Sequence, residues 1–369
     1  MTNKEQIIVG ITHGDINGIS YEVIIKTLMD NRIMEKCTPV VYGSPKVAAY
    51  HRKALNITNF SFVNIRDAAE ANHKKANIIN CLDDNVRVEL GKSTPMAGKS
   101  AVIPLEAAVE DLKENKIDVI VTAPINKHNI QSDIFNFPGH TEYLKHKFDV
   151  DDALMLMVSE NIRVGVVTGH MPLRNVPDNL SKEIIIRKIK IMDSSLTIDF
   201  GIRKPRIAVL SLNPHSSDSG LLGDEEKEII IPAIEEVSEG GIFAFGPYPS
   251  DGFFGSGAYT SFDGIMAMYH DQGLTPFKTL VRGEGVNYTA GLPVIRTSPS
   301  HGTAYEIAGK GTASENSFRH ALYLACDIFR NRVMYREITG DSLKPHDLDT
   351  NTEEPDELPP DEENSNDTL

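Results

Sequence analysis

Short apolar runs alternate with helix-like segments along most of this 369-residue chain, and this alternation limits the possible folds more than any other feature. Buried strands are predicted at 7–11, 38–42, 118–122, 155–158, 163–167, 207–212 and 264–269. Helices are predicted at 21–29, 104–115, 181–192, 225–239 and 315–333. Strands that alternate with helices in this way predict an α/β fold with a mainly parallel sheet.

The composition, with 40% hydrophobic and 24% charged residues, is ordinary for a soluble globular enzyme. No apolar stretch approaches the length of a membrane span, and the first apolar run is too short for a signal peptide. Cys37, Cys81 and Cys326 have no metal-binding spacing, which indicates reduced thiols. The net charge is −15, so no basic surface for nucleic acid is expected. We therefore expect a cytoplasmic protein that binds neither membrane nor nucleic acid.

Most of this negative charge lies at the end of the chain. Residues 340–369 hold eleven acidic residues against one lysine, together with four prolines and few apolar side chains. Such a segment cannot bury enough apolar surface to fold, so we expect a disordered, solvating acidic tail.

A stretch rich in Gly, Ser and Thr at 297–316 is too polar to fill a core. It contains His301, Gly302, Thr303 and Ala304, followed by the sequence AGKGTA. Glycine lets a backbone approach a ligand closely, and exposed amides and hydroxyls bind adenosine or phosphate. The stretch resembles the adenosine-binding loop of the isocitrate and isopropylmalate dehydrogenases, whereas a GxGxxG dinucleotide motif after the first strand is absent.

Three histidines share one sequence context. His170, His215 and His270 each follow an apolar run that predicts a strand. Ligand groups in open α/β sheets lie just beyond the carboxyl ends of strands, so these imidazoles could converge on one divalent cation. Three histidine ligands suit Zn, Co, Mn or Fe, and Mg only with the help of oxygen ligands. A single histidine beside a strand is more often a hydrogen-bonded structural residue, and it is the repeated context that favours a shared metal site.

Many short motifs occur in one order along the chain. This series resembles that of the 4-hydroxythreonine-4-phosphate dehydrogenases of pyridoxal 5'-phosphate biosynthesis, over roughly residues 7–335. The motifs are THGDINGI at 12–19, TAPINK at 122–127, FPGHTE at 137–142, TGH at 168–170, LNPH at 212–215, GPYPSD at 246–251, YHDQG at 269–273, FK at 277–278, VNYTAGLP at 286–293, IR at 295–296 and the 297–316 stretch.

The resemblance implies an architecture. It implies a fold like that of the isocitrate and isopropylmalate dehydrogenases, with two α/β/α lobes around a cleft. Residues 1–335 would then form one two-lobed catalytic unit in which the chain crosses between the lobes. It also implies a homodimer whose subunits share each active site.

The resemblance also implies a reaction and a set of site residues. NAD or NADP would oxidise the C3 hydroxyl of 4-phosphooxy-L-threonine, and the resulting β-keto acid would lose CO2 to give 3-amino-2-oxopropyl phosphate. The matching metal ligands are His170, His215 and His270, one of them from across the dimer interface. The matching substrate contacts are His140, Thr141, Lys278, Asn287 and Arg296.

The chemistry of these residues agrees with that substrate but leaves the general base open. Lys278 and Arg296 supply positive charge for a phosphate or carboxylate. A bound divalent metal would lower the pKa of the substrate alcohol. The base that takes the hydroxyl proton could be Lys278, Asp251 or Asp271, and the sequence does not choose among them. Asp271 could instead support the histidine beside it.

The first motif departs from the family pattern, which is commonly GDPAGIGPE. Ile16, Asn17, Ser20 and Tyr21 stand here where the family has Pro, Ala, Gly and Pro. The loss of two prolines and a glycine predicts a change in loop stiffness. Asp15 and Asn17 are expected to shape a loop at the cleft.

Three other functions compete with this interpretation. A paralogous dehydrogenase would oxidise 4-phosphothreonate or 4-phosphoerythronate. A phosphohydrolase would use the histidines to activate water, which leaves the 301–313 loop without a role. A metabolite-binding protein without catalytic activity would be expected to lack some of these residues.

Overall fold

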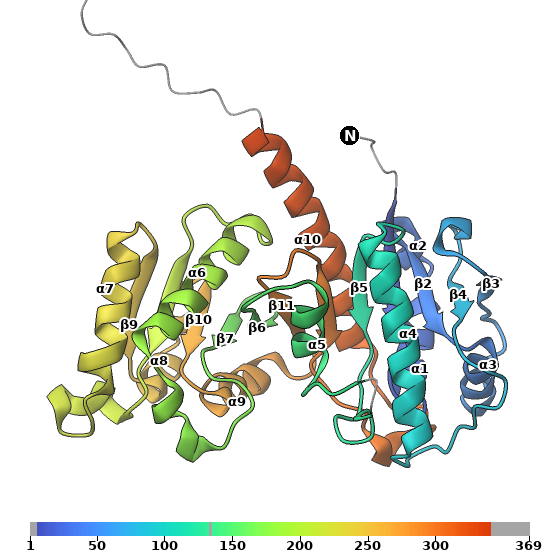
Figure 1. Cartoon of the computed structure of the whole chain (residues 1–369), viewed down its shortest axis with the longest axis horizontal. Helices are drawn as coiled ribbons and strands as arrows, with labels where there is room; N and C mark the ends of the chain where they lie inside the picture. Colours follow the sequence, from blue (N-terminus) through green and yellow to red (C-terminus); the bar gives the residue numbers. More distant parts are fainter. Residues whose placement is uncertain (1–5, 133–134, 341–369) are drawn as a thin grey trace, which may run out of the picture.

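The computed structural model describes residues 6–132 and 135–340, and its centre is one twelve-stranded mixed sheet (Figure 1). The strand order is β3-β4-β2-β1-β5-β12-β11-β6-β7-β10-β8-β9. The strands are β1 Ile7–Thr12, β2 Cys37–Gly43, β3 Val63–Ile65, β4 Asn77–Asn80, β5 Val119–Thr122, β6 Leu154–Val158, β7 Arg163–Val166, β8 Arg206–Leu210, β9 Phe243–Tyr248, β10 Gly264–Ala267, β11 Val286–Ala290 and β12 Arg296–Pro299.

The α-helices connect these strands and cover both faces of the sheet (Figure 1). They are α1 Ser20–Leu28, α2 Arg32–Lys36, α3 Pro45–Ala54, α4 Pro95–Lys113, α5 His140–Lys147, α6 Lys182–Ile198, α7 Ile231–Glu239, α8 Ser250–Gly255, α9 His270–Val281 and α10 Asn316–Gly340. The α/β prediction is therefore confirmed.

All seven predicted strands and all five predicted helices are present, with shifted ends. The helix predicted at 104–115 is the second half of α4, which begins at Pro95 after Thr94 caps it by accepting from the Ala97 amide. The helix predicted at 225–239 begins with a π-helical turn, Glu226–Ile230, before α7. The sequence did not predict β3, β4, β9, β11 and β12, nor α2, α3, α5, α8 and α9.

Most strand pairs are parallel, as predicted, but the central pairs β12–β11, β11–β6 and β6–β7 are antiparallel. These three reversals make the strands of the second half run opposite to those of the first half. Figure 1 shows the two halves, with β1–β5 and α1–α4 at one end and β7–β10 with α6–α9 at the other. The chain crosses to the second half after β5 and returns through β11, β12 and α10, so both halves form one unit.

The two faces of the sheet pack differently. On one face a continuous apolar core lies under α1, α6, α7 and α10. On the opposite face there are two separate cores, one under α4 and α5 and one under α8 and α9. Between these two cores the central strands carry less apolar cover, and this is where the cavities described below lie.

One prediction concerns residues that the structure does not describe, and another concerns membrane spans. The predicted acidic tail, from residue 341 onward, lies outside the part of the chain that the structure describes. Within the described part, no helix has both the length and the apolar character needed to cross a membrane.

Candidate active site

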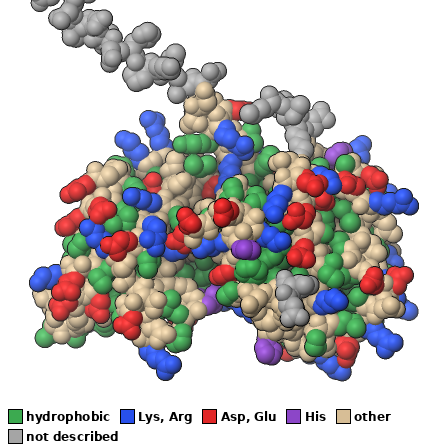
Figure 2. Space-filling view, viewed as in Figure 1, with side chains coloured by type: hydrophobic (Ala, Val, Ile, Leu, Met, Phe, Trp, Pro, Cys, Tyr) green, Lys and Arg blue, Asp and Glu red, His purple; other side chains and the backbone are tan. Residues whose placement is uncertain are grey.

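Two adjoining cavities of about 250 and 240 Å³ lie over the central strands, between the two separate cores. Figure 2 shows a notch between the two halves of the molecule, with histidine side chains beside it. The first cavity extends to Thr141, Lys145 and Lys188, and the second extends to His270, Lys278 and His301. Both are lined by Ile125, Lys127, His140, Met155, His170, Asn287 and Arg296.

The two-residue period of the central strands places polar groups at the floor of these cavities. On β11, Asn287 lines both cavities, whereas its neighbour Tyr288 is buried in the continuous core. On β6, Met155 lines both cavities and Leu156 faces the same core as Tyr288. The side-chain oxygen of Asn287 is buried without a hydrogen-bond partner, which leaves it free for a ligand.

Arg296, the first residue of β12, is only 4% exposed. Its Nε and Nη2 donate to the Thr122 hydroxyl at 3.0 and 2.7 Å, and its Nη1 donates to the Thr289 hydroxyl at 3.2 Å. No ion pair among the described residues includes Arg296. Burial lowers the pKa of Arg296 to about 10. The guanidinium is therefore a buried cation whose hydrogen-bond partners are neutral, and the Glu142 carboxylate acts on it only through Coulombic attraction, so an anionic ligand would supply a closer counter-charge.

His140 and Thr141 begin α5 and line the first cavity. Arg296 Nη2 lies 3.2 Å from His140 Nδ1. Because arginine only donates, Nδ1 must accept and Nε2 must carry the proton. Burial, the Arg296 charge and the Lys127 charge hold the pKa of His140 well below its usual range. His140 is thus a neutral donor at a helix N-terminus, an arrangement that suits an anion.

His170 and His270 lie together, with ring centroids 5.1 Å apart. They follow β7 and β10, which are adjacent and parallel, so their carboxyl ends share one edge of the sheet. The carboxylate of Asp271 accepts from His270 Nδ1 at 2.7 Å, which leaves Nε2 of His270 as the available metal-binding nitrogen. Asp271 therefore occupies the supporting position, and its side chain is 82% exposed.

His215 is not brought to this pair within the chain. It follows β8 in the turn Pro214–Gly220, is exposed and lines neither cavity. Across the described residues, no three His, Cys, Asp or Glu side chains are grouped to hold a metal. The two imidazoles nevertheless fit a divalent transition metal in donor chemistry, with ligand positions left for groups from elsewhere.

The three candidate bases lie in different surroundings. Lys278 lines the second cavity from α9, eight residues after His270 and therefore on the same helix face. Asp271 bonds His270 as described. Asp251 lies at the start of α8, exposed and outside both cavities.

The predicted cofactor loop contributes directly to the second cavity. His301 and Gly302 line it, whereas Thr303 and Ala304 do not. The Thr303 carbonyl instead accepts from the Ile19 amide at 3.0 Å. A Cβ at Gly18 would lie 2.6 Å from that carbonyl oxygen, so only glycine allows this approach. Nε2 of His301 is buried without a partner, and burial lowers the pKa of this imidazole.

Asp15 joins three loops at this end of the cleft. Its fully buried carboxylate accepts from the Tyr305 hydroxyl at 2.6 Å, from Asn129 Nδ2 at 2.9 Å and from the Asn17 amide at 2.8 Å. Asn17 binds the 89–94 segment in turn, through its side chain to the Glu89 amide at 2.7 Å and to other groups there. Asp15 and Asn17 therefore hold this loop in shape as predicted, whereas neither of them lines the two cavities.

The sequence analysis assigned no role to three lysines that line the first cavity, Lys127, Lys145 and Lys188. Lys127 ends the TAPINK motif, so its place in the motif series was a usable signal. Lys145 and Lys188 lie on α5 and α6, and only the tertiary structure brings these helices to one cavity.

Together, the two-part sheet and the cleft lined by lysines, histidines and Arg296 define an α/β protein whose cleft has the side-chain chemistry to hold a small anion. The chain belongs to the family described as "Pyridoxal phosphate biosynthetic protein PdxA", whose sequence profile matches residues 35–325.

Known relatives agree with this membership. A 4-hydroxythreonine-4-phosphate dehydrogenase of Bacteroides thetaiotaomicron is 59% identical over 331 residues, which cover 89% of this chain and 90% of the relative. An Oceanobacillus iheyensis relative, provisionally named a D-threonate 4-phosphate dehydrogenase, is 38% identical and covers 87% of this chain and 97% of its own. The crystal structure of the Klebsiella pneumoniae 4-hydroxythreonine-4-phosphate dehydrogenase has a TM-score of 0.77, 35% identity, and covers 89% of this chain and 99% of its own.

Proposed function

We propose that the protein is a metal-dependent oxidoreductase that uses NAD or NADP to oxidise 4-phosphooxy-L-threonine. Loss of CO2 from the oxidised product then gives 3-amino-2-oxopropyl phosphate for pyridoxal 5'-phosphate biosynthesis. The observation that carries this proposal is the buried Arg296 guanidinium, which lies where the two cavities meet and has only neutral hydrogen-bond partners. The names of the most similar relatives support the choice of substrate.

The substrate's anionic groups lie against Arg296 and the start of α5. His140 donates through Nε2, and Thr141 adds a hydroxyl beside it. Asn287 offers its unpartnered side-chain oxygen to a donor such as the substrate ammonium or hydroxyl. Charged partners in a shielded cleft hold a small polar ligand in one orientation, which favours hydride transfer to a neighbouring dinucleotide.

His170 and His270 would hold a divalent metal ion, Zn, Co, Mn or Mg, together with His215 of a second copy of the chain. When bound, the ion would supply positive charge that favours ionisation of the substrate hydroxyl and offsets the negative charge that develops during decarboxylation. A homodimer could bury exposed leucines that follow His170 and His215 in the sequence, and burial of apolar surface favours association. Leu173 is 68% exposed, Leu221 78% and Leu222 44%.

Lys278 takes the hydroxyl proton. Of the three candidate bases, Lys278 is the one that lines a cavity, whereas Asp271 is hydrogen-bonded to His270. It extends from the helix face that also carries His270, so substrate held at the histidines lies within its reach.

The dinucleotide binds along 301–304, beside the second cavity. His301 and Gly302, which line the cavity, would hold the dinucleotide together with Thr303 and Ala304, and the dinucleotide would accept the hydride. Gly18 lies against the Thr303 carbonyl of that loop.

The test is absorbance at 340 nm with metal-loaded protein, either dinucleotide and 4-phosphooxy-L-threonine, run beside 4-phospho-D-threonate and 4-phospho-D-erythronate. Turnover of the first substrate that is lost with chelator and in His215→Ala supports the proposal. Turnover of only the other two keeps the fold and chemistry but assigns the paralogous activity, which the relative from Oceanobacillus iheyensis represents. Inactivity with every substrate, in folded and metal-loaded protein, refutes the proposal.

A further inference from the structure

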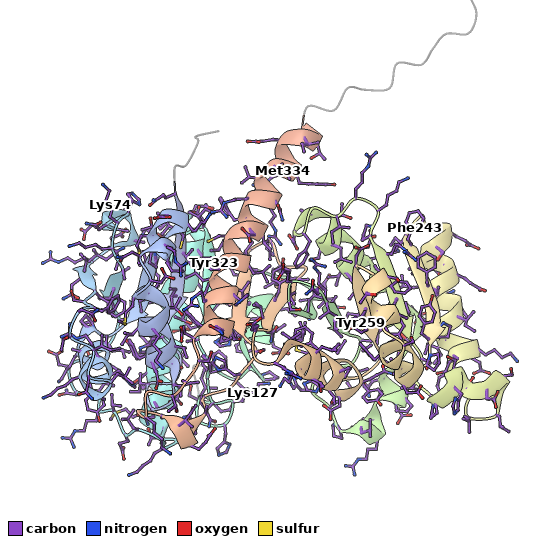
Figure 3. The ribbon with its side chains drawn as sticks, turned by 180° about the vertical axis from the view of Figure 1, so that it is seen from behind. Lys74, Lys127, Phe243, Tyr259, Tyr323 and Met334 are labelled. Carbon is purple, nitrogen blue, oxygen red and sulfur yellow. The ribbon has the colours of Figure 1, made fainter. Side chains whose placement is uncertain are left out.

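Lys127 lines the cleft but has no role in the proposed reaction. It follows β5 and lines both cavities, between His140 on one side and His170 on the other. Figure 3 labels it at the middle of the molecule, between the two halves. No ion pair among the described residues includes Lys127, although the Glu142 carboxylate also lines the first cavity.

The ammonium of Lys127 lies 3.3 Å from Nε2 of His170. An ammonium has three donors and no acceptor, so Nε2 must present its lone pair to Lys127. A metal bound at His170 Nε2 would need that same lone pair, and a divalent cation would also be repelled by the ammonium. Metal and Lys127 therefore compete for one atom.

The Lys127 charge also reaches the opposite wall of the cavity. It contributes to lowering the pKa of both His140 and His170. The lysine side chain has a flexible four-carbon stem, and its terminus lies where the two cavities join. A small rotation of this stem would take the ammonium from His170 toward an anion held by His140 and Arg296.

We propose that Lys127 is a substrate-binding residue that blocks His170 from the metal until an anionic ligand draws its ammonium away. This inference rests on the proposed metal site at His170 and His270. It predicts that anion and metal favour each other's binding, because each removes a competitor of the other, and such coupling is reciprocal.

The experiment compares the wild-type protein with Lys127→Met and with Lys127→Arg. Co²⁺ binding is followed by its visible absorption, and inorganic phosphate binding to the metal-free protein is followed by calorimetry. Lys74→Met is the matched control, because Lys74 is exposed at the far end of the molecule (Figure 3). Circular dichroism checks that each variant is folded.

Loss of the ammonium should tighten Co²⁺ binding by about fivefold or more, since one hydrogen bond and one repulsion are removed. It should weaken phosphate binding by about tenfold or more, since a charge-assisted contact is lost. Lys127→Arg should restore phosphate affinity, and Lys74→Met should change neither affinity.

The possible failures are distinguishable. Wild-type protein that binds Co²⁺ with the same or higher affinity than Lys127→Met refutes the blocking role alone. Unchanged phosphate affinity in Lys127→Met refutes the substrate-binding role. Absence of Co²⁺ binding by every variant refutes the blocking role together with the proposed metal site, whereas the phosphate arm still tests the anion contact.

Discussion

Replacement of Arg296 by methionine should remove ligand binding while leaving the ligand-free protein nearly as stable as before. Methionine fills a similar volume but carries no charge. The guanidinium is 4% exposed, and its described partners are the hydroxyls of Thr122 and Thr289 and the ring of His140. A structural ion pair would behave differently, because its loss would leave a buried carboxylate without a partner.

The structure allows the opposing free energies to be compared. A pKa of about 10 for Arg296 lies well below the usual value for arginine. The difference corresponds to a net cost of about 3 kcal/mol, in which burial outweighs the attraction of the Glu142 carboxylate. The hydrogen bonds to Thr122, Thr289 and His140 contribute about 1 kcal/mol each in the opposite direction. The two contributions nearly cancel, so Arg296→Met should change the free energy of unfolding by no more than about 1 kcal/mol.

An anion that neutralises Arg296 should then stabilise the wild-type protein only. Inorganic phosphate at one hundred times its Kd should raise the free energy of unfolding by about 2.7 kcal/mol. Urea unfolding with and without phosphate measures both quantities, with Arg66→Met as the control because Arg66 is exposed in the first half. The reasoning is refuted if Arg296→Met loses more than about 3 kcal/mol without ligand and phosphate still stabilises it as it does the wild type.

Four further predictions follow from other contacts. Asp271→Asn should weaken metal binding by about tenfold to a hundredfold without unfolding the protein, because the His270 ring loses its anionic partner. A metal titration of the folded variant measures this change in affinity. Tyr305→Phe should raise the KM for the dinucleotide far more than the KM for the substrate, because the buried Asp15 carboxylate loses the Tyr305 hydroxyl that donates to it at 2.6 Å. Steady-state kinetics with each ligand varied in turn measure both constants, and an equal rise in the two would contradict the prediction. Burial lowers the pKa of His13 and of His51 to about 4 in the folded protein, whereas both histidines titrate near pH 6.5 in the unfolded chain. As the pH falls from 7 to 5, protons therefore bind the unfolded chain preferentially, and each histidine should lower the free energy of unfolding by about 2 kcal/mol. In urea unfolding, His51→Phe should show a smaller pH dependence than the wild type. Burial raises the pKa of the Cys81 thiol to about 12, and with Cys37 and Cys326 fully buried, a thiol reagent should label the three cysteines rapidly only after unfolding.

The predictable part of the fold was the part with a strong hydrophobic period. Runs such as 7–11 and 118–122 became β1 and β5, because a strand buried on both faces has no polar interruption. The strands β11 and β12 carry Asn287 and Arg296 among their residues, and polar side chains that face a cavity break that period. The helix α9 carries Gly273 and Pro276, which signal a turn when the sequence is considered locally.

The structure brings some of the predicted site residues together and leaves others apart. The rule that ligands follow strand ends brought His170 and His270 to one place, because β7 and β10 are neighbours. The rule does not predict how the turn after β8 orients His215, or that Asp251 is exposed. Lys127 had no sequence signal beyond its motif, because its importance depends on the distance to His170, a residue 43 positions away.

In the first motif, buried side-chain contacts hold the loop in place of the prolines and glycine that the resemblance leads one to expect. Where the family commonly has proline, Tyr21 is fully buried, and its hydroxyl lies 2.8 Å from His13 Nδ1 and accepts from the Ser44 amide at 2.9 Å. Asn17 fixes the neighbouring segment through its side chain. Proline limits a loop by restricting the backbone, whereas these side chains limit it by buried hydrogen bonds that each contribute about 1 kcal/mol. The loop at the cleft is therefore held by packing rather than by backbone restriction, and its stiffness should depend on these contacts.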